Sequence, residues 1–473
     1  MKQLSMITVF RRLITAASLA AVAAIAAISA TAPAAAAQHS HSHATEATTR
    51  SDTTSRARES HDHRNTMSHE MWMLPLGDGW TLGGMAQAIP TLTGSESRGP
   101  DVAPHAWELY LTQPAMMADV LSPGSRFALR VTLNFEGLTQ RDGETSYGAW
   151  GEGFIDSRHP HTLLHEAMLS ANVWRSAAGA FSLSAGKGFA PYGTDDPMSR
   201  PPIKYPTNHH LSQILERWTV NAQYLTRGGT SVEAGIFGGA EPTGPYDFSN
   251  VSSFGDSWSM RLGQRFGGGF GPSTPWEASA SYADVKQDGH GGGERTKLAN
   301  VALRHQRSYG FGNLYALAEA SKSWPQGNDG YYSILGETSV GMGSGARHQP
   351  YYRFELATRP EYEREGVQGT DAFFRYHHDA PAIGATRWVV NTIGYAYRAT
   401  DLPVSVRPYV ELQHNDVRHE RGPAGPHALY GASSFWSISF GMRLFFGGGE
   451  MRMGSYGLLD PMAAAMRPAA PSR

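Results

Sequence analysis

The sequence contains no cysteine among its 473 residues. This absence excludes disulfides, thiolate metal sites, a cysteine nucleophile and a lipid anchor attached through cysteine. The charges are nearly balanced, with 40 Lys and Arg against 42 Asp and Glu, so nothing suggests a nucleic-acid partner. After Ala37 no run of about 18 apolar residues occurs, which excludes helical membrane spans.

The chain is rich in glycine and aromatic residues, with 53 Gly, 20 Tyr, 19 Phe and 11 Trp, and this composition favours strands and turns. Its start has the pattern of a secretory signal: basic residues, the mostly apolar stretch 13–28, and the small residues Ala35–Ala37. We therefore expect export from the cytoplasm. The predicted segments are a signal peptide (1–37), a flexible His/Met-rich periplasmic arm (38–79), a β-barrel (80–446) and a C-terminal tail (447–473).

Alternation of apolar and polar residues indicates strands with one apolar face and one polar face. In "FWSISFGMRLFF" (435–446) one face is wholly apolar and aromatic, and the other is small or polar between two end aromatics. The same period of two recurs in "RFALRVTLNFE" (126–136), "WTVNAQY" (218–224) and "VSVRPYVELQ" (404–413). Many of these runs are long and end in aromatic residues, as in the interfacial girdle of a membrane barrel.

Seventeen runs show this pattern, and since a single-chain bacterial barrel has an even number of strands, one of them should be wrong. We predict an all-β, transmembrane antiparallel barrel of about 16 strands (14–18) in the bacterial outer membrane. A soluble all-β secreted protein is the alternative. The candidate runs are 80–92, 106–120, 126–136, 163–174, 180–187, 212–225, 230–239, 257–266, 276–285, 297–307, 313–322, 331–340, 350–358, 370–377, 387–397, 404–413 and 435–446, and the run to drop is 370–377.

Two stretches carry candidate chemistry. "DSRHPHTLLHE" (156–166) places His159 and His161 at the start of a strand, either as a loop rim or as a functional histidine cluster with His165. "GKGFAPYGTDDPMSRPPIKYPTNHH" (186–210) holds five prolines and is too long for an ordinary connection. It is predicted either to fold into the lumen as a constriction, where it could meet the histidines of 156–166, or to be a surface loop.

These two stretches resemble an uncharacterised family of predicted bacterial outer-membrane β-barrel (porin-like) proteins, with His-Pro-His at a strand start and a later Pro-rich loop ending in His-His. That family is associated with the handling of copper and other metals. The resemblance implies a barrel and a link to metal, and it implies no transport mechanism.

The arm 38–79 is also similar to the His/Met-rich arms of copper-resistance outer-membrane proteins. Imidazole and thioether ligands suit copper better than calcium or magnesium, although alternating histidines also occur in low-complexity linkers. Copper is the candidate ion, and no other cofactor is predicted. The candidate metal ligands are His39, His41, His43, His61, His63, Met67, His69, Met71, Met73, His159, His161, His165, His209 and His210.

The lumen-facing positions of the predicted strands favour Arg (126, 130, 261, 265, 304, 407, 443) over Glu (136, 166, 411), which suggests a mild anion preference. The candidate pore-lining residues are Arg130, Glu136, Glu166, Asp195, Asp196, Arg200, Lys204, Arg261, Arg265, Arg407, Glu411 and Arg443.

The expected function is a passive, non-catalytic, porin-like channel or conduit in metal handling or resistance. The expected partners are outer-membrane lipid, small ions or solutes, the barrel-assembly machinery and a second and third copy in a homotrimer. The alternatives are a plugged surface-binding or adhesive barrel and a barrel-borne outer-membrane hydrolase, for which the sequence offers no Ser-His pair that we would name.

Overall fold

The computed structural model divides the chain into two units, Met1–Arg64 and Asn65–Arg473, and every described residue lies in the second. The described residues are 72–96, 107–136, 162–176, 178–207, 209–242, 246–267, 275–286, 295–326, 329–362, 382–399, 404–423, 425–447 and 453–456.

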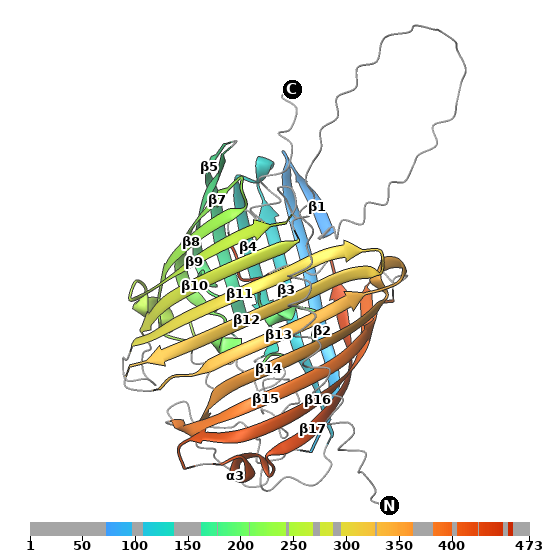
Figure 1. The fold of residues 1–473 in the computed structure, drawn as a ribbon. Coiled ribbons are helices and arrows are strands. Elements are labelled where there is room, and N and C mark those ends of the chain that lie inside the picture. The colour runs from blue at the N-terminus through green and yellow to red at the C-terminus, as the bar shows by residue number, and fades with distance from the viewer. Residues whose placement is uncertain are drawn as a thin grey trace, which may run out of the picture. The chain divides into compact units, whose positions relative to one another are not determined.

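A closed antiparallel barrel forms the second unit (Figure 1). Each strand from β2 to β17 pairs with its neighbour in the sequence, and β17 returns to pair with β2, so 16 strands close the ring. The strands are β2 (Trp80–Ser95), β3 (Trp107–Leu121), β4 (Phe127–Asn134), β5 (Leu164–Arg175), β6 (Gly179–Gly188), β7 (Arg217–Thr226), β8 (Thr230–Phe237), β9 (Ser257–Phe266), β10 (Trp276–Lys286), β11 (Arg295–Tyr309), β12 (Gly312–Pro325), β13 (Tyr332–Gly341), β14 (His348–Tyr362), β15 (Ala382–Tyr397), β16 (Ser405–Arg421) and β17 (Ser434–Phe446).

The predicted fold class is therefore confirmed. Sixteen of the seventeen predicted runs correspond to these strands, and β14 pairs directly with β15, so the ring is complete without the candidate at 370–377. That candidate lies outside the described residues. The predicted run 212–225 began too early, because residues 212–216 precede β7.

The structure contains one additional strand, β1 (Trp72–Gly77). It lies within the arm that was predicted to be flexible up to residue 79, so the C-terminal end of that prediction is wrong. β1 pairs with the start of β2 through a two-residue turn at Asp78 and Gly79. Both turn residues have positive φ, 49° and 79°, the conformation that Asp-Gly adopts in a tight hairpin.

The connections differ between the two ends of the barrel. At one end the turns are short, such as residues 227–229 between β7 and β8 and residues 310–311 between β11 and β12. At the other end they are long, such as residues 189–216 between β6 and β7 and residues 238–256 between β8 and β9. In outer-membrane barrels the short turns face the periplasm, which also assigns the long loops to the outside.

The polarity of the two faces of the wall is the reverse of that in a soluble protein, with apolar side chains outside and charged side chains inside. On the outer face Leu129, Leu169 and Leu262 are 41%, 54% and 53% exposed, whereas Glu166 and Glu411 on the inner face are fully buried. Aromatic rings pair across outer strand ends, as in Trp174–Tyr224 and Phe266–Trp276. An apolar outside with every backbone group paired inside a closed sheet is what a lipid bilayer requires. Among the described residues, no helix is long and apolar enough to cross a membrane.

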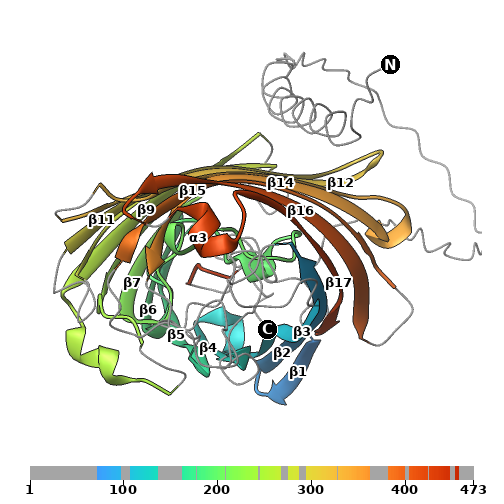
Figure 2. The same ribbon diagram turned by 90° about the horizontal axis from the view of Figure 1, so that it is seen from below.

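Among the described residues, two segments inside the ring bear on the site. The described residues of 189–216, here called the lumenal segment, fold inward from the long-loop end; Figure 2 shows green ribbon from this part of the chain inside the ring of strands. Met453–Tyr456, here called the C-terminal segment, contact the lumenal segment. The described helices are short: η1 (Pro123–Ser125), η2 (Pro197–Ser199), η3 (His209–Leu211), η4 (Ser249–Ser253), η5 (Ser344–Ala346) and α3 (Pro426–Tyr430).

Candidate functional site

The lumenal segment is ordered by local turns that its sequence encodes. The Asp196 side chain caps η2, because its Oδ1 accepts a hydrogen bond from the Met198 amide at 2.7 Å. Gly193 has a φ of 68°, and a Cβ built there would lie 1.7 Å from the Ser212 carbonyl oxygen. Only glycine fits, and this close approach brings the two ends of the segment together.

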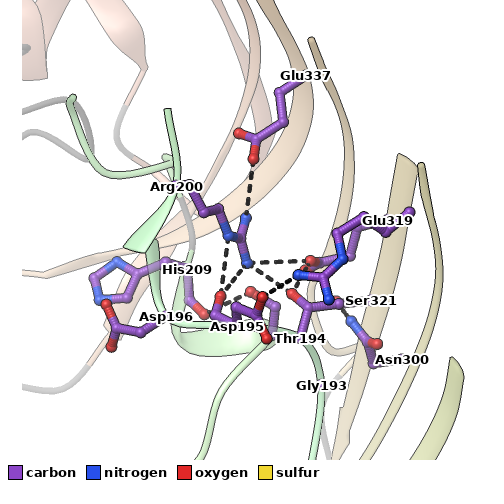
Figure 3. Close-up of polar contacts among 12 residues, drawn as sticks. Gly193, Thr194, Asp195, Asp196, Arg200, His209, Asn300, Glu319, Ser321 and Glu337 are labelled. Atoms are coloured by element: carbon purple, nitrogen blue, oxygen red, sulfur yellow. Dashed lines mark hydrogen bonds and ion pairs between the residues drawn. The ribbon is translucent and has the colours of Figure 1, made fainter. Parts of the chain in front are cut away.

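Arg200 anchors the middle of the segment to the wall (Figure 3). Its guanidinium lies 3.4 Å from the Glu319 carboxylate on β12 and 3.9 Å from the Glu337 carboxylate on β13. The same guanidinium donates to the Thr194 hydroxyl at 2.6 Å and to the Asp195 carbonyl at 2.7 Å. All three charged side chains are at least nine-tenths buried, so the hydrogen bonds must offset a large desolvation cost.

A second chain of charges continues from Asp195. Its carboxylate pairs with Arg304 on β11, which also lies 3.2 Å from Glu277 on β10. Glu277 in turn lies 2.9 Å from Arg265 on β9. Charges therefore alternate in sign from the lumenal segment along three neighbouring strands.

The later half of the segment binds the wall through its backbone. The Thr207 amide donates to Glu355 on β14 at 2.5 Å, and Arg353 on the same strand donates to the Lys204 carbonyl at 2.6 Å. Arg443 on β17 donates to the Arg200 carbonyl at 3.2 Å. The segment thus contacts wall strands on well-separated parts of the ring, which supports its interpretation as a constriction.

Charged side chains of the inner wall also pair with each other across adjacent strands. Arg130 faces Asp119 in the β3–β4 register with 2.9 Å between their atoms, and Arg261 faces Glu233 in the β8–β9 register at 2.7 Å. The predicted excess of arginine on the inner face is therefore wrong. The carboxylates that pair with these arginines, Asp119 and Glu233, lie on strands for which the sequence analysis did not predict which side chains face inward. Arg126, which was counted among the inner arginines, is exposed in a turn. Opposite charges at directly opposed positions favour this register.

The C-terminal segment is held by both the wall and the lumenal segment. The Tyr456 hydroxyl donates to Glu166 on β5 at 2.6 Å and accepts from the Phe189 amide at 2.9 Å. Arg261 donates to the Gly454 carbonyl at 3.1 Å. Burial and the neighbouring Glu166 carboxylate raise the pKa of Tyr456 well above its ordinary range, so its hydroxyl remains a donor. The predicted tail 447–473 therefore includes a segment that packs inside the barrel.

The candidate metal ligands are brought together only in part. His165 points inward and its Nδ1 lies 2.7 Å from the carboxylate of Glu216, the last residue of the lumenal segment. The rings of His209 and His210 are 4.2 Å apart at their centroids. In the part of the chain that the structure describes, no group of three or more His, Asp or Glu side chains could hold a metal ion.

The other candidate ligands lie outside the described side chains. Met73 lies in β1, although its side chain is not described. The remaining candidates fall outside the described residues: His39, His41, His43, His61, His63, Met67, His69, Met71, His159 and His161.

All the candidate pore-lining residues lie on the inner face or in the lumenal segment, and their role as pore lining stays a prediction. They are buried except for Asp195, Arg265 and Arg407, which are half-buried. The buried ones are Arg130, Glu136, Glu166, Asp196, Arg200, Lys204, Arg261, Glu411 and Arg443.

Sequence reasoning missed several residues that hold the site. Arg353, Glu355, Arg359 and Glu361 alternate along β14, a period-two charge pattern that would have assigned its inner face. Glu319 was harder to find, because apolar residues lie on both faces of β12, with Leu317 buried beside it. For Tyr456 we find no sequence signal.

No protein-family model matches the chain, and no curated protein matches it. Solved structures similar to it include an anion-selective porin from Comamonas acidovorans, with 12% identity, 78% of this chain and 100% of the porin covered, and a TM-score of 0.45. OprB of Pseudomonas putida has 11% identity, covers 77% and 94%, and has a TM-score of 0.45. The outer-membrane channel DcaP of Acinetobacter baumannii has 9% identity, covers 79% and 99%, and has a TM-score of 0.45.

The barrel belongs in the bacterial outer membrane. This location follows from the closed 16-strand ring, the apolar outer face and the polar inner face, which are those of outer-membrane barrels.

Proposed function

We propose that the protein is a passive outer-membrane channel for small ions or solutes, narrowed by the lumenal segment and by the C-terminal segment. The observation that carries this proposal is the inner wall, which is lined with buried polar and charged side chains around the ion pairs of Arg200. A barrel with 16 strands encloses an interior wide enough for a water-filled channel. A polar inner wall is typical of barrels whose interior holds water and solutes.

Charge pairing supports weak ion selectivity in this channel. Arg130, Arg261 and Arg304 each lie beside a carboxylate, so the wall presents dipoles rather than rings of one sign. We expect the passage to discriminate by size at the lumenal segment more than by charge.

Single-channel recording in a planar lipid bilayer tests the proposal. Folded protein, verified by its heat-modifiable mobility in gel electrophoresis, is expected to give discrete conductance steps. A silent bilayer from folded protein contradicts the channel. It would instead support a plugged barrel that acts through its surface loops, an alternative favoured by the contacts that the lumenal segment makes on many sides of the wall.

A role in copper handling remains part of the proposal and depends on the arm. Its histidines and methionines between His39 and Met73 would raise the local concentration of copper in the periplasm. Copper titration of a peptide covering residues 38–73 is expected to show binding that is lost when its six histidines are replaced by alanine. Equal binding by both peptides contradicts this role.

Two further expectations also stay proposals. A homotrimer would be detected by native mass spectrometry of the detergent-solubilised protein, and dependence on the barrel-assembly machinery by depletion of that machinery in cells. A barrel-borne hydrolase has no specific observation in its favour among the described residues.

A further inference from the structure

Four methionine side chains from distant parts of the sequence lie in one buried apolar cluster inside the barrel. Met85 on β2, Met117 on β3, Met168 on β5 and Met453 of the C-terminal segment belong to one buried cluster. We call them the methionine cluster. They pack with Phe189, Leu215, Phe445 and Tyr456.

Strand register and close packing bring these side chains together. Met85 lies directly opposite Met117 in the β2–β3 register, where Cβ atoms are about 4.5–5.5 Å apart. A Cβ built on Gly188 would lie 3.3 Å from the Met168 methyl and 2.1 Å from the Tyr456 hydroxyl oxygen. The absence of a side chain at Gly188 therefore leaves room for Met168 and the C-terminal segment. Met453 is fixed by its carbonyl, which accepts from the Asp196 amide at 3.1 Å.

The described methionines are grouped on the inner side of the wall and dispersed on its outer side. Among the described methionine side chains, five are buried, and four of these form the cluster, while Met198 packs elsewhere. The exposed ones are dispersed: Met116, Met260, Met342 and Met442. Methionine fills irregular gaps in cores, so apolar packing is the competing explanation that the test below separates from metal binding.

The chemistry of the cluster differs from that of the rest of the lumen. Thioether sulfur is a soft ligand that selects Cu(I) and similar ions, whereas carboxylates and carbonyls suit hard ions. Cationic and anionic groups flank the cluster: Arg130 lies opposite Met168 in register and is paired with Asp119 at 2.9 Å. Glu166, bonded to Tyr456 and to Thr132, supplies negative charge beside it.

We propose that Met85, Met117, Met168 and Met453 form a thioether site for a soft monovalent cation, Cu(I) or Ag(I), on the inner wall. The site goes beyond the proposed channel function and uses no residue of the His/Met-rich arm. It would place a metal-binding step inside the barrel as well as in the periplasm.

The test uses the full-length protein in detergent micelles with 13C-labelled methionine methyl groups. Titration with silver nitrate in chloride-free buffer is expected to shift the methyl resonances of the four cluster methionines together, with saturation at one ion. The resonances of Met116, Met260 and Met442 are expected to stay in place. Silver bound by the arm is seen separately, at Met67, Met71 and Met73.

Adjacent residues of β3 provide the matched variants. Met117 is buried and Met116 is 54% exposed on the opposite face, and a change from methionine to leucine roughly conserves volume. Met117→Leu is expected to weaken silver binding at the other three cluster methyls at least about tenfold, and Met116→Leu to leave it unchanged. The proposal is overturned if the cluster resonances do not shift, or if both variants bind like wild type while retaining heat-modifiable mobility. The readout does not use conductance, so the result for the metal site is independent of the result for the channel proposal.

Discussion

The two sides of the lumen hold the same segment by different means. Toward β11–β14 the contacts are ionic, through Arg200, Glu319, Glu337 and the Asp195–Arg304 pair. Toward β2, β3 and β5 the methionine cluster with Phe189 and Tyr456 adds an apolar surface, beside the His165–Glu216 and Tyr456–Glu166 hydrogen bonds. The first side fixes the segment by direction and charge, whereas the second is a soft surface that adapts to what lies against it.

The ionic contacts and the methionine cluster are expected to have different roles in holding the lumenal segment. Buried ion pairs lose much when one partner is removed, because the other charge is left in a poorly solvated place. Methionine side chains repack at small cost, since they are flexible and unbranched. We therefore expect the charged side to set the position of the segment and the methionine side to tolerate change.

The largest effect is expected from Arg200→Met. It removes the arginine beside Glu319 and one of the two arginines beside Glu337, which Arg353 also approaches at 3.8 Å, and should weaken docking of the lumenal segment by about 3–5 kcal/mol. Hydrogen exchange of residues 194–207 should accelerate, and open-channel current noise should rise. Arg418→Met is the control, because Arg418 is 64% exposed and its pair with Asp416 is worth at most about 1 kcal/mol. Equal behaviour of the two variants would contradict the anchoring role.

A smaller effect is expected from Tyr456→Phe on the opposite side. The change leaves the Phe189 amide and Glu166 without the hydroxyl, at a cost of about 1–3 kcal/mol. Exchange of the Phe189 amide hydrogen reports this bond directly and should accelerate. Tyr224→Phe on the outer face is the matched control. Unchanged exchange in Tyr456→Phe would show that the C-terminal segment does not hold the constriction.

The smallest effect is expected on ion selectivity. Glu277 lies between Arg265 and Arg304 and is one-quarter exposed, so Glu277→Gln should favour anions by at most about 1 kcal/mol. Reversal potentials in a salt gradient measure the change, and Asp416→Asn, at a half-buried carboxylate paired with the exposed Arg418, serves as control. A shift toward cations, or none, would mean that these charges do not face the conducting path.

The wall was predictable from the sequence because lipid and lumen impose opposite demands on alternate residues. In β9, Trp258, Met260 and Leu262 face outward while Ser259 and Arg261 face inward, as the period of two predicts. The strand β1 was missed although the Asp78-Gly79 pair before Trp80 is a hairpin signal.

The site was only partly predictable, because its contacts join residues far apart in the sequence. Five prolines indicated that the stretch up to His210 was no strand, and its charged residues suggested a lumenal position. Arg200 pairs with Glu319 and Glu337 because the barrel curves back between β6 and β13. No local sequence pattern encodes this curvature. The return of Tyr456 into the barrel is likewise a tertiary event without a sequence signature.

The most direct test of the constriction is its removal. Because Gly193 lies against the Ser212 carbonyl, two glycines in place of residues 194–211 can span the gap between these two residues. Single-channel recording of this variant beside wild type should show discrete steps of several-fold larger conductance, with heat-modifiable mobility unchanged. Steps of unchanged size from the folded variant would contradict the central claim that the lumenal segment narrows the pore.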